Sequence, residues 1–106
     1  MSPSGNEGRT EPLGAFEHLV MLAILRLDAG AYGVPIREEI VRRAGRQVSY
    51  GAVYSALRRM ENKGWLAADV GEPEPVQGGR ARKFYRVTDR GLEVLRRVNL
   101  LFLNGT

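Results

Sequence analysis

The sequence contains no cysteine and a single histidine, His18. The absence of cysteine excludes disulfides, thiolate metal sites and cysteine nucleophiles. A Ser-His-Asp arrangement would need the one imidazole, and the apolar helical run around His18 argues against an exposed general base. We therefore expect no catalytic site, no metal site and no cofactor.

Long uncharged apolar runs are also missing, and the chain begins without a secretory leader pattern. With 106 residues, 43% hydrophobic and 26% charged, it has the composition of an ordinary soluble domain. We expect one domain in the cytoplasm, with no membrane partner. Residues 1–12 lack apolar periodicity and are interpreted as a disordered tail.

Positive charge is concentrated in one segment. The formal net charge of the chain is +4, and the stretch from Arg80 to Arg90 alone sums to +4. Such a local excess is typical of a surface that binds a polyanion. A solvated charged face is the alternative interpretation.

Helical periodicity predicts a first helix from Leu13 to Asp28. One stripe of it is apolar, and Met21, Leu22 and Leu25 make the opposite side apolar as well. A chain of this size offers few elements to cover both sides, so we expect the second side to contact another subunit. A helix buried on both sides within a monomer is the alternative.

Two further helices are expected in close succession. Pro35 suits the first turn of a helix that runs to Ala44, and Gly45 ends it. Helical periodicity places Arg37 on the outward side of this helix. Ser49 is placed to cap a helix from Tyr50 to about Lys63. This spacing predicts a helix-turn-helix, in which the second helix enters the major groove of DNA.

The side of that second helix opposite its core positions is sparse and polar. The residues at the spacing of a core-facing stripe are Val53, Ala56, Leu57 and Met60. The predicted DNA-binding residues come from the side opposite the core, from the start of the helix and from the two edges between these sides. They are Ser49, Tyr50, Gly51, Tyr54, Ser55, Arg58 and Arg59. Tyr54 fits a phosphate contact or a partly buried packing role equally well.

A hairpin follows, with strands predicted at Leu66–Val70 and Lys83–Val87 and a glycine-rich tip between them. The residues that follow the tip are basic, and they add Arg80, Arg82 and Lys83 to the predicted DNA-binding set. Strand alternation places Lys83 on the opposite face from the two arginines. Trp65, which precedes the first strand, is expected in the core. The fold class is therefore mostly α with a small β-hairpin, a winged helix-turn-helix of order α-α-α-β-β-α.

Thr88 can cap a last helix whose apolar arc is wide. We assign residues 13–87 to the winged helix-turn-helix and residues 88–106 to a dimerisation helix. The expected dimer interface consists of Met21, Leu22, Leu25, Val94, Val98, Leu101 and Phe102.

From about Leu13 to Leu95 the chain resembles the bacterial PadR-like transcriptional regulators. The resemblance rests on the segments YGAVYSALRRMENKGW and GRARKFYRVTDRG and on the Tyr32-Gly33 step. It implies a homodimeric regulator on an inverted-repeat operator, with Tyr54 as the recognition-helix tyrosine and Arg80, Arg82 and Lys83 as the basic wing. Ser55 stands where the family often has proline.

The chain is similar to short family members with one C-terminal helix, some of which bind flat aromatic or drug-like effectors at the dimer interface. The leading hypothesis is thus a sequence-specific regulator of transcription, expected to be a repressor, with double-stranded DNA and a second copy of itself as partners and such an effector as a further one. The alternative is a winged-helix module that binds protein or ligand and not DNA.

Overall fold

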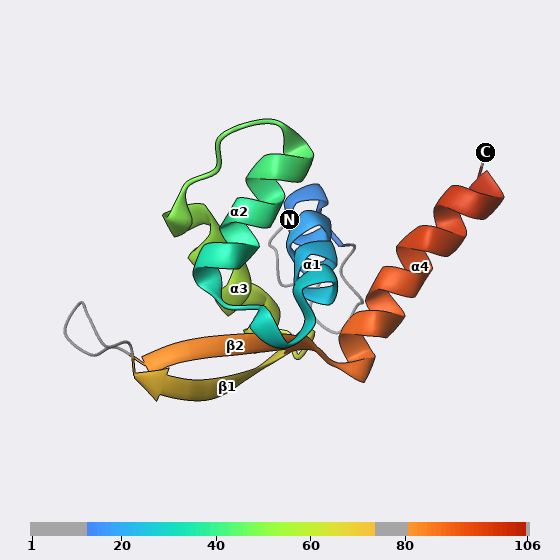
Figure 1. The fold of residues 1–106 in the computed structure, drawn as a ribbon. Coiled ribbons are helices and arrows are strands. Elements are labelled where there is room, and N and C mark those ends of the chain that lie inside the picture. The colour runs from blue at the N-terminus through green and yellow to red at the C-terminus, as the bar shows by residue number, and fades with distance from the viewer. Residues whose placement is uncertain (1–12, 74–80, 106) are drawn as a thin grey trace, which may run out of the picture.

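The computed structural model describes residues 13–73 and 81–105, with side chains described for 13–71 and 82–98. Its elements are α1 (Ala15–Leu27), the short 3-10 helix η2 (Asp28–Gly30), α2 (Gly33–Ala44), α3 (Tyr50–Asn62), β1 (Leu66–Pro73), β2 (Ala81–Val87) and α4 (Asp89–Gly105). This confirms the predicted order and fold class. Figure 1 shows α1, α2 and α3 grouped on one side of the hairpin, while α4 leaves from the end opposite its tip.

The predicted helix caps are confirmed. Ser49 Oγ accepts a hydrogen bond from the Ala52 amide at 3.0 Å, which satisfies a free donor at the start of α3. Thr88 Oγ1 accepts from the Gly91 amide at 3.0 Å and itself donates to the Gly64 carbonyl at 2.6 Å. Thr88 therefore caps α4 and ties it to the end of α3.

The helix boundaries differ slightly from those expected. α1 begins at Ala15 because the Glu17 carboxylate accepts from the Gly14 amide at 3.1 Å and so closes the first turn. α2 begins at Gly33, two residues before Pro35, and Pro35 still lies in the first turn, where no amide hydrogen is needed. It ends as predicted at Gly45, which adopts a left-handed φ of 70°.

One hydrophobic core joins the four α-helices and the hairpin. Its larger buried side chains include Val20, Met21, Ile24, Ile36, Ile40, Val53, Leu57, Met60, Trp65, Leu66, Tyr85, Val94 and Leu95. The inward positions predicted for α3 and the core position predicted for Trp65 are confirmed.

Two residues expected at a dimer interface belong to this core instead. Met21 is 0% exposed and Val94 is 5% exposed within a single chain. Met21 is covered because α1 packs against α2, α3 and β2, and Val94 lies near the start of α4, which packs against β2, so neither side chain faces outward as expected. Leu25 is 44% exposed, and Leu22 and Val98 are half-buried, so these three still face outward in part.

The hairpin is antiparallel, with Leu66 opposite Val87 and Val70 opposite Lys83, and its register shifts between Val70 and Pro73. The strands extend further toward the tip than predicted. The Tyr85 amide donates to the Ala31 carbonyl at 2.8 Å, so β2 is also held to the segment between η2 and α2. The predicted tip glycines and Arg80 lie outside the described residues.

Candidate nucleic-acid interface

The side of α3 that is predicted to contact DNA, called the reading side below, is exposed. Ser49, Tyr50, Gly51, Tyr54, Ser55 and Arg58 all lie at the surface. Arg58 makes no ion pair within the described part of the chain. The small residues permit close approach, and the arginine supplies a donor fork for a base edge or a phosphate.

Tyr54 is both exposed and packed. It is 45% exposed, yet its ring lies over Gly33 at the start of α2, where a Cβ atom would come within 2.6 Å of Tyr54 Cζ. Tyr50 stacks beside it, with ring centroids 6.4 Å apart and planes inclined by 25°. The two interpretations of Tyr54 are therefore compatible, because its packing leaves almost half of the side chain accessible.

Arg59 has a structural partner that the sequence did not suggest. Its Nε lies 3.3 Å from Glu17 Oε2, on α1, and Glu17 is buried. The ion pair connects α3 to the capped first turn of α1. The pairing engages the Arg59 guanidinium with α1, while about half of the Arg59 side chain remains exposed.

The basic residues of β2 point to two faces, as alternation predicted. The Arg82 guanidinium lies 4.7 Å from the centroid of the Tyr32 ring, and Tyr32 in turn meets Phe84 edge-on with centroids 5.3 Å apart. Tyr32 directly precedes Gly33, and Gly33 lies under the Tyr54 ring. These contacts link Arg82 on the hairpin, through the start of α2, to α3.

Lys83, on the other face, is engaged within the protein. Its Nζ donates to Glu61 Oε1 on α3 at 3.2 Å and lies 5.7 Å from the centroid of the Tyr85 ring. The hydrogen bond to Glu61 raises the pKa of Lys83 above its ordinary value, and burial raises the pKa of Tyr85. Lys83 thus joins the hairpin to α3, with half of its side chain still exposed.

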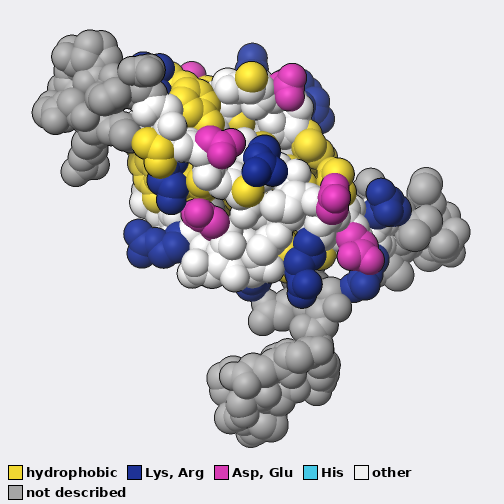
Figure 2. Space-filling model, turned by 90° about the horizontal axis from the view of Figure 1, so that it is seen from below, with side chains coloured by type: hydrophobic (Ala, Val, Ile, Leu, Met, Phe, Trp, Pro, Cys, Tyr) yellow, Lys and Arg dark blue, Asp and Glu magenta, His cyan; other side chains and the backbone are white. Residues whose placement is uncertain are grey.

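Charges of both signs occur near the hairpin. Arg86 Nε lies 3.5 Å from Asp69 Oδ2 across the two strands, and both side chains are exposed. Figure 2, the view from below, shows Lys and Arg side chains interspersed with Asp and Glu on the described part of that face. The local charge excess seen in the sequence is therefore partly neutralised by one cross-strand pair, Arg86 with Asp69, and one pair between a strand and a helix, Lys83 with Glu61.

Between α1 and α2 the structure contains a cluster that sequence reasoning missed. Glu39, which is buried, accepts hydrogen bonds from Arg42 and from Arg43, the latter at 2.9 Å, and Arg26 Nε lies 3.9 Å away. The hydrogen bond from Arg43 holds the pKa of Glu39 below its ordinary value, although burial acts in the opposite direction. Arginines three and four residues after Glu39 were the available sequence signal.

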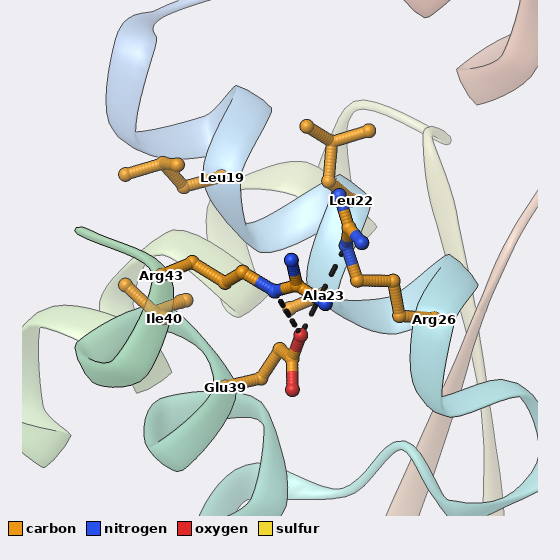
Figure 3. Close-up of a pocket in the computed structure, with 7 residues that line it drawn as sticks. All are labelled: Leu19, Leu22, Ala23, Arg26, Glu39, Ile40 and Arg43. Atoms are coloured by element: carbon orange, nitrogen blue, oxygen red, sulfur yellow. Dashed lines mark hydrogen bonds and ion pairs between the residues drawn. The ribbon is translucent and has the colours of Figure 1, made fainter.

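This cluster borders a small pocket of about 90 Å³ lined by Leu19, Leu22, Ala23, Arg26, Glu39, Ile40 and Arg43. Figure 3 shows Arg26 and Arg43 directed at Glu39, with Leu19 and Leu22 contributed by α1. Sites for drug-sized ligands enclose about 300–1,000 Å³. The α1–α2 pocket is therefore too small for such an effector.

Of the remaining predicted interface residues, Leu101 and Phe102 have side chains outside the described residues. Among the helices that the structure describes, none is long and apolar enough to span a membrane. Over the same residues, no three side chains of metal-binding type come together.

The model of the transcriptional regulator PadR-like family matches residues 21–97 of this chain. A PadR family transcriptional regulator from Eggerthella lenta DSM 2243 is 34% identical, with a TM-score of 0.60 over 79% of this chain and 70% of the other. A PadR family regulator from Clostridium difficile R20291 is 29% identical, with a TM-score of 0.66 over 82% and 85% of the two chains.

A PadR-like regulator from Bacillus cereus strain ATCC 14579 is 25% identical, with a TM-score of 0.64 over 82% of this chain and 80% of that one. No curated protein matches the sequence. Family members are transcriptional regulators, which argues against enzymatic activity. The match across most of the chain, the 34% identity and the shared winged helix show that this protein belongs to the PadR-like family of transcriptional regulators.

Proposed function

We propose that this chain is a sequence-specific transcriptional regulator that binds double-stranded DNA as a homodimer. The observation that carries the proposal is the exposed side of α3, with its small residues and Arg58, which the contacts of Tyr54 with Gly33 and of Tyr32 with Arg82 link to the hairpin. An exposed helix side with small residues and an accessible arginine fits the major groove.

Ser55 and Arg58 are the proposed base-reading residues. They lie one turn apart on the exposed side of α3, and a guanidinium reaches two acceptors on a guanine edge. Ser49, Tyr50, Gly51 and Tyr54 lie nearer the start of the helix and are proposed to approach the sugar-phosphate chain. Free amides in the first turn of α3 favour phosphate at that end.

In the hairpin, Arg82 is the proposed phosphate contact, together with Arg80, which lies outside the described residues. Lys83 has a smaller part in the proposal because Glu61 already neutralises its charge. Arg59 is left out of the proposed interface because Glu17 holds it against α1.

The proposed dimer uses those predicted interface residues whose side chains remain at least partly exposed in the single chain. These are Leu25 and the half-buried Leu22 on α1 and Val98 on α4, with Leu101 and Phe102 added from the sequence. A two-fold dimer presents two copies of α3 to half-sites about 34 Å apart, which corresponds to an inverted-repeat operator.

We further propose that the bound dimer represses transcription by excluding polymerase from the operator it occupies. A protein with this role works beside the DNA, which in a bacterium is in the cytoplasm. The α1–α2 pocket is too small for an aromatic or drug-like effector, and we propose that such an effector binds at a site that two subunits form together.

Selection of bound fragments from random and genomic DNA tests the proposal. We expect enrichment of one motif with two inverted halves. If no fragment is enriched at moderate salt, the chain is a winged-helix interaction module and the proposed function is wrong.

A further inference from the structure

Arg37 directs its side chain at the turn that precedes α3, although helical periodicity predicts it on the outer side of α2. Its Nε donates to the Val48 carbonyl at 2.7 Å, and its Nη2 donates to Gln47 Oε1 at 3.2 Å. Both acceptors lie in the short connection between α2 and α3. The rigid guanidinium fork therefore fixes this connection from the α2 side.

The same guanidinium lies 4.7 Å from the centroid of the Tyr50 ring, in the first turn of α3. Tyr50 stacks on Tyr54, which covers Gly33. Gly33 and Arg37 are one turn apart on α2, and Tyr50 and Tyr54 are one turn apart on α3. Two contacts, Gly33 with Tyr54 and Arg37 with Tyr50, thus hold the two helices together on their exposed side.

We propose that Arg37 is a positioning residue that fixes the first turn of α3 for reading DNA, an inference that rests on the function proposed above. The Arg37 side chain is engaged by the Val48 carbonyl, Gln47 and the Tyr50 ring. It acts through the placement of α3 and does not itself neutralise a phosphate.

This role makes a distinct prediction about binding. Base contacts depend on hydrogen-bond geometry, so a shift of α3 weakens recognition of the correct sequence. Attraction to phosphates is long-ranged and independent of sequence, so it tolerates the same shift. Loss of Arg37 should therefore reduce discrimination between sequences and leave the salt dependence of binding unchanged.

The test compares Arg37→Met, which keeps the apolar stem and removes every donor, with Arg46→Met as the matched control. Arg46 is an exposed arginine in the same connection, and its side chain makes no ion pair among the described residues. Affinities are measured for the selected duplex and for a scrambled duplex over a range of salt concentrations. Arg37→Met should lower the ratio of the two affinities about tenfold, whereas Arg46→Met should preserve it.

Arg37→Lys should give an intermediate ratio, because one ammonium can still donate to the Val48 carbonyl but cannot form the fork. Fluorine NMR of the free protein, labelled with fluorotyrosine, provides a readout without DNA. In Arg37→Met the Tyr50 resonance should shift and that of the buried Tyr85 should not.

Three results would overturn the inference: an unchanged affinity ratio in Arg37→Met, an equal loss in Arg46→Met, or an unmoved Tyr50 resonance. A salt slope reduced by about 0.9 in Arg37→Met would identify a direct phosphate contact and overturn it as well. If the wild-type protein does not discriminate between the duplexes, the proposed function itself fails. If wild type and Arg37→Met discriminate between the duplexes to the same degree, the role proposed for Arg37 is wrong and the proposed function stands.

Discussion

Tyr54 of α3 lies directly over Gly33 of α2, so closely that a Cβ atom on residue 33 would come 2.6 Å from Tyr54 Cζ. The first turn of one helix and the proposed reading side of the next are therefore in contact. Because glycine leaves the space that the tyrosine ring fills, the position of this ring depends on the residue at 33.

Gly33→Ala should displace the Tyr54 ring and weaken operator binding about tenfold, an estimate equivalent to roughly 1.4 kcal/mol. Thermal stability should fall as well, because the ring must move and the glycine penalty of a helix interior does not apply at the first residue of α2. Fluorescence anisotropy and thermal unfolding measure the two effects. In a Tyr54→Ala background the same change should cost no further affinity, and equal losses in both backgrounds would refute the coupling.

Arg82→Ala should reduce the slope of log affinity against log salt by about 0.9, the value for one phosphate contact on duplex DNA. Adding Arg80→Ala should about double that reduction. Arg96→Ala, which removes an exposed arginine from α4, is the control and should leave the slope unchanged. Equal slopes for wild type and the double variant would exclude the hairpin from the interface.

Leu25→Glu should weaken the dimer, because it places a charge at the most exposed apolar position of α1 that we assign to the interface. Val70→Glu is the matched control, since Val70 is 71% exposed on the hairpin and outside the proposed interface. Light scattering at micromolar concentration should show a dimer for wild type and Val70→Glu and dissociation for Leu25→Glu. A monomeric wild-type protein would contradict the assignment.

Glu39→Gln should lower the melting temperature at pH 7, because it removes the charge that Arg43, Arg42 and Arg26 surround. The pKa of Glu39 is lower in the folded chain than in the unfolded one, so its stabilisation is fully present above the unfolded value of about 4.3. It is lost as pH falls through the folded value. The difference in melting temperature between Glu39→Gln and wild type should therefore shrink toward pH 3.

Glu38→Gln, on the exposed side of the same helix, is the control for that experiment. It should melt close to wild type at pH 7. If the melting temperatures of Glu39→Gln and wild type differ by the same amount at pH 7 and pH 3, the carboxylate charge is not the cause of the difference.

The sequence alone predicts those features that depend on residues close together along the chain. Ser49, Thr88 and Gly45 mark helix ends because caps and left-handed turns involve near neighbours along the chain. The inward positions of α3 follow from periodicity in the same way. The winged helix can thus be predicted from the amino-acid sequence alone.

Contacts between distant segments cannot be read from periodicity. Helical spacing predicts Met21 at the dimer interface, but α2, α3 and β2 together cover it. The position of Arg59 on α3 does not indicate its ion pair with Glu17, which lies forty-two positions earlier. Arg37 is predicted outward for the same reason, because nothing in a helical pattern indicates a hydrogen bond to the Val48 carbonyl.

The central claim, that the exposed side of α3 reads DNA sequence, is tested most directly by one affinity ratio. Wild-type protein and a Ser55→Ala, Arg58→Ala variant are titrated at one salt concentration against the selected duplex and a scrambled duplex of equal length. We predict that wild type prefers the selected duplex by about a thousandfold or more and that the variant loses most of this preference while it still binds both duplexes. Equal affinity of the wild-type protein for the two duplexes, or an undiminished preference in the variant, would contradict the claim.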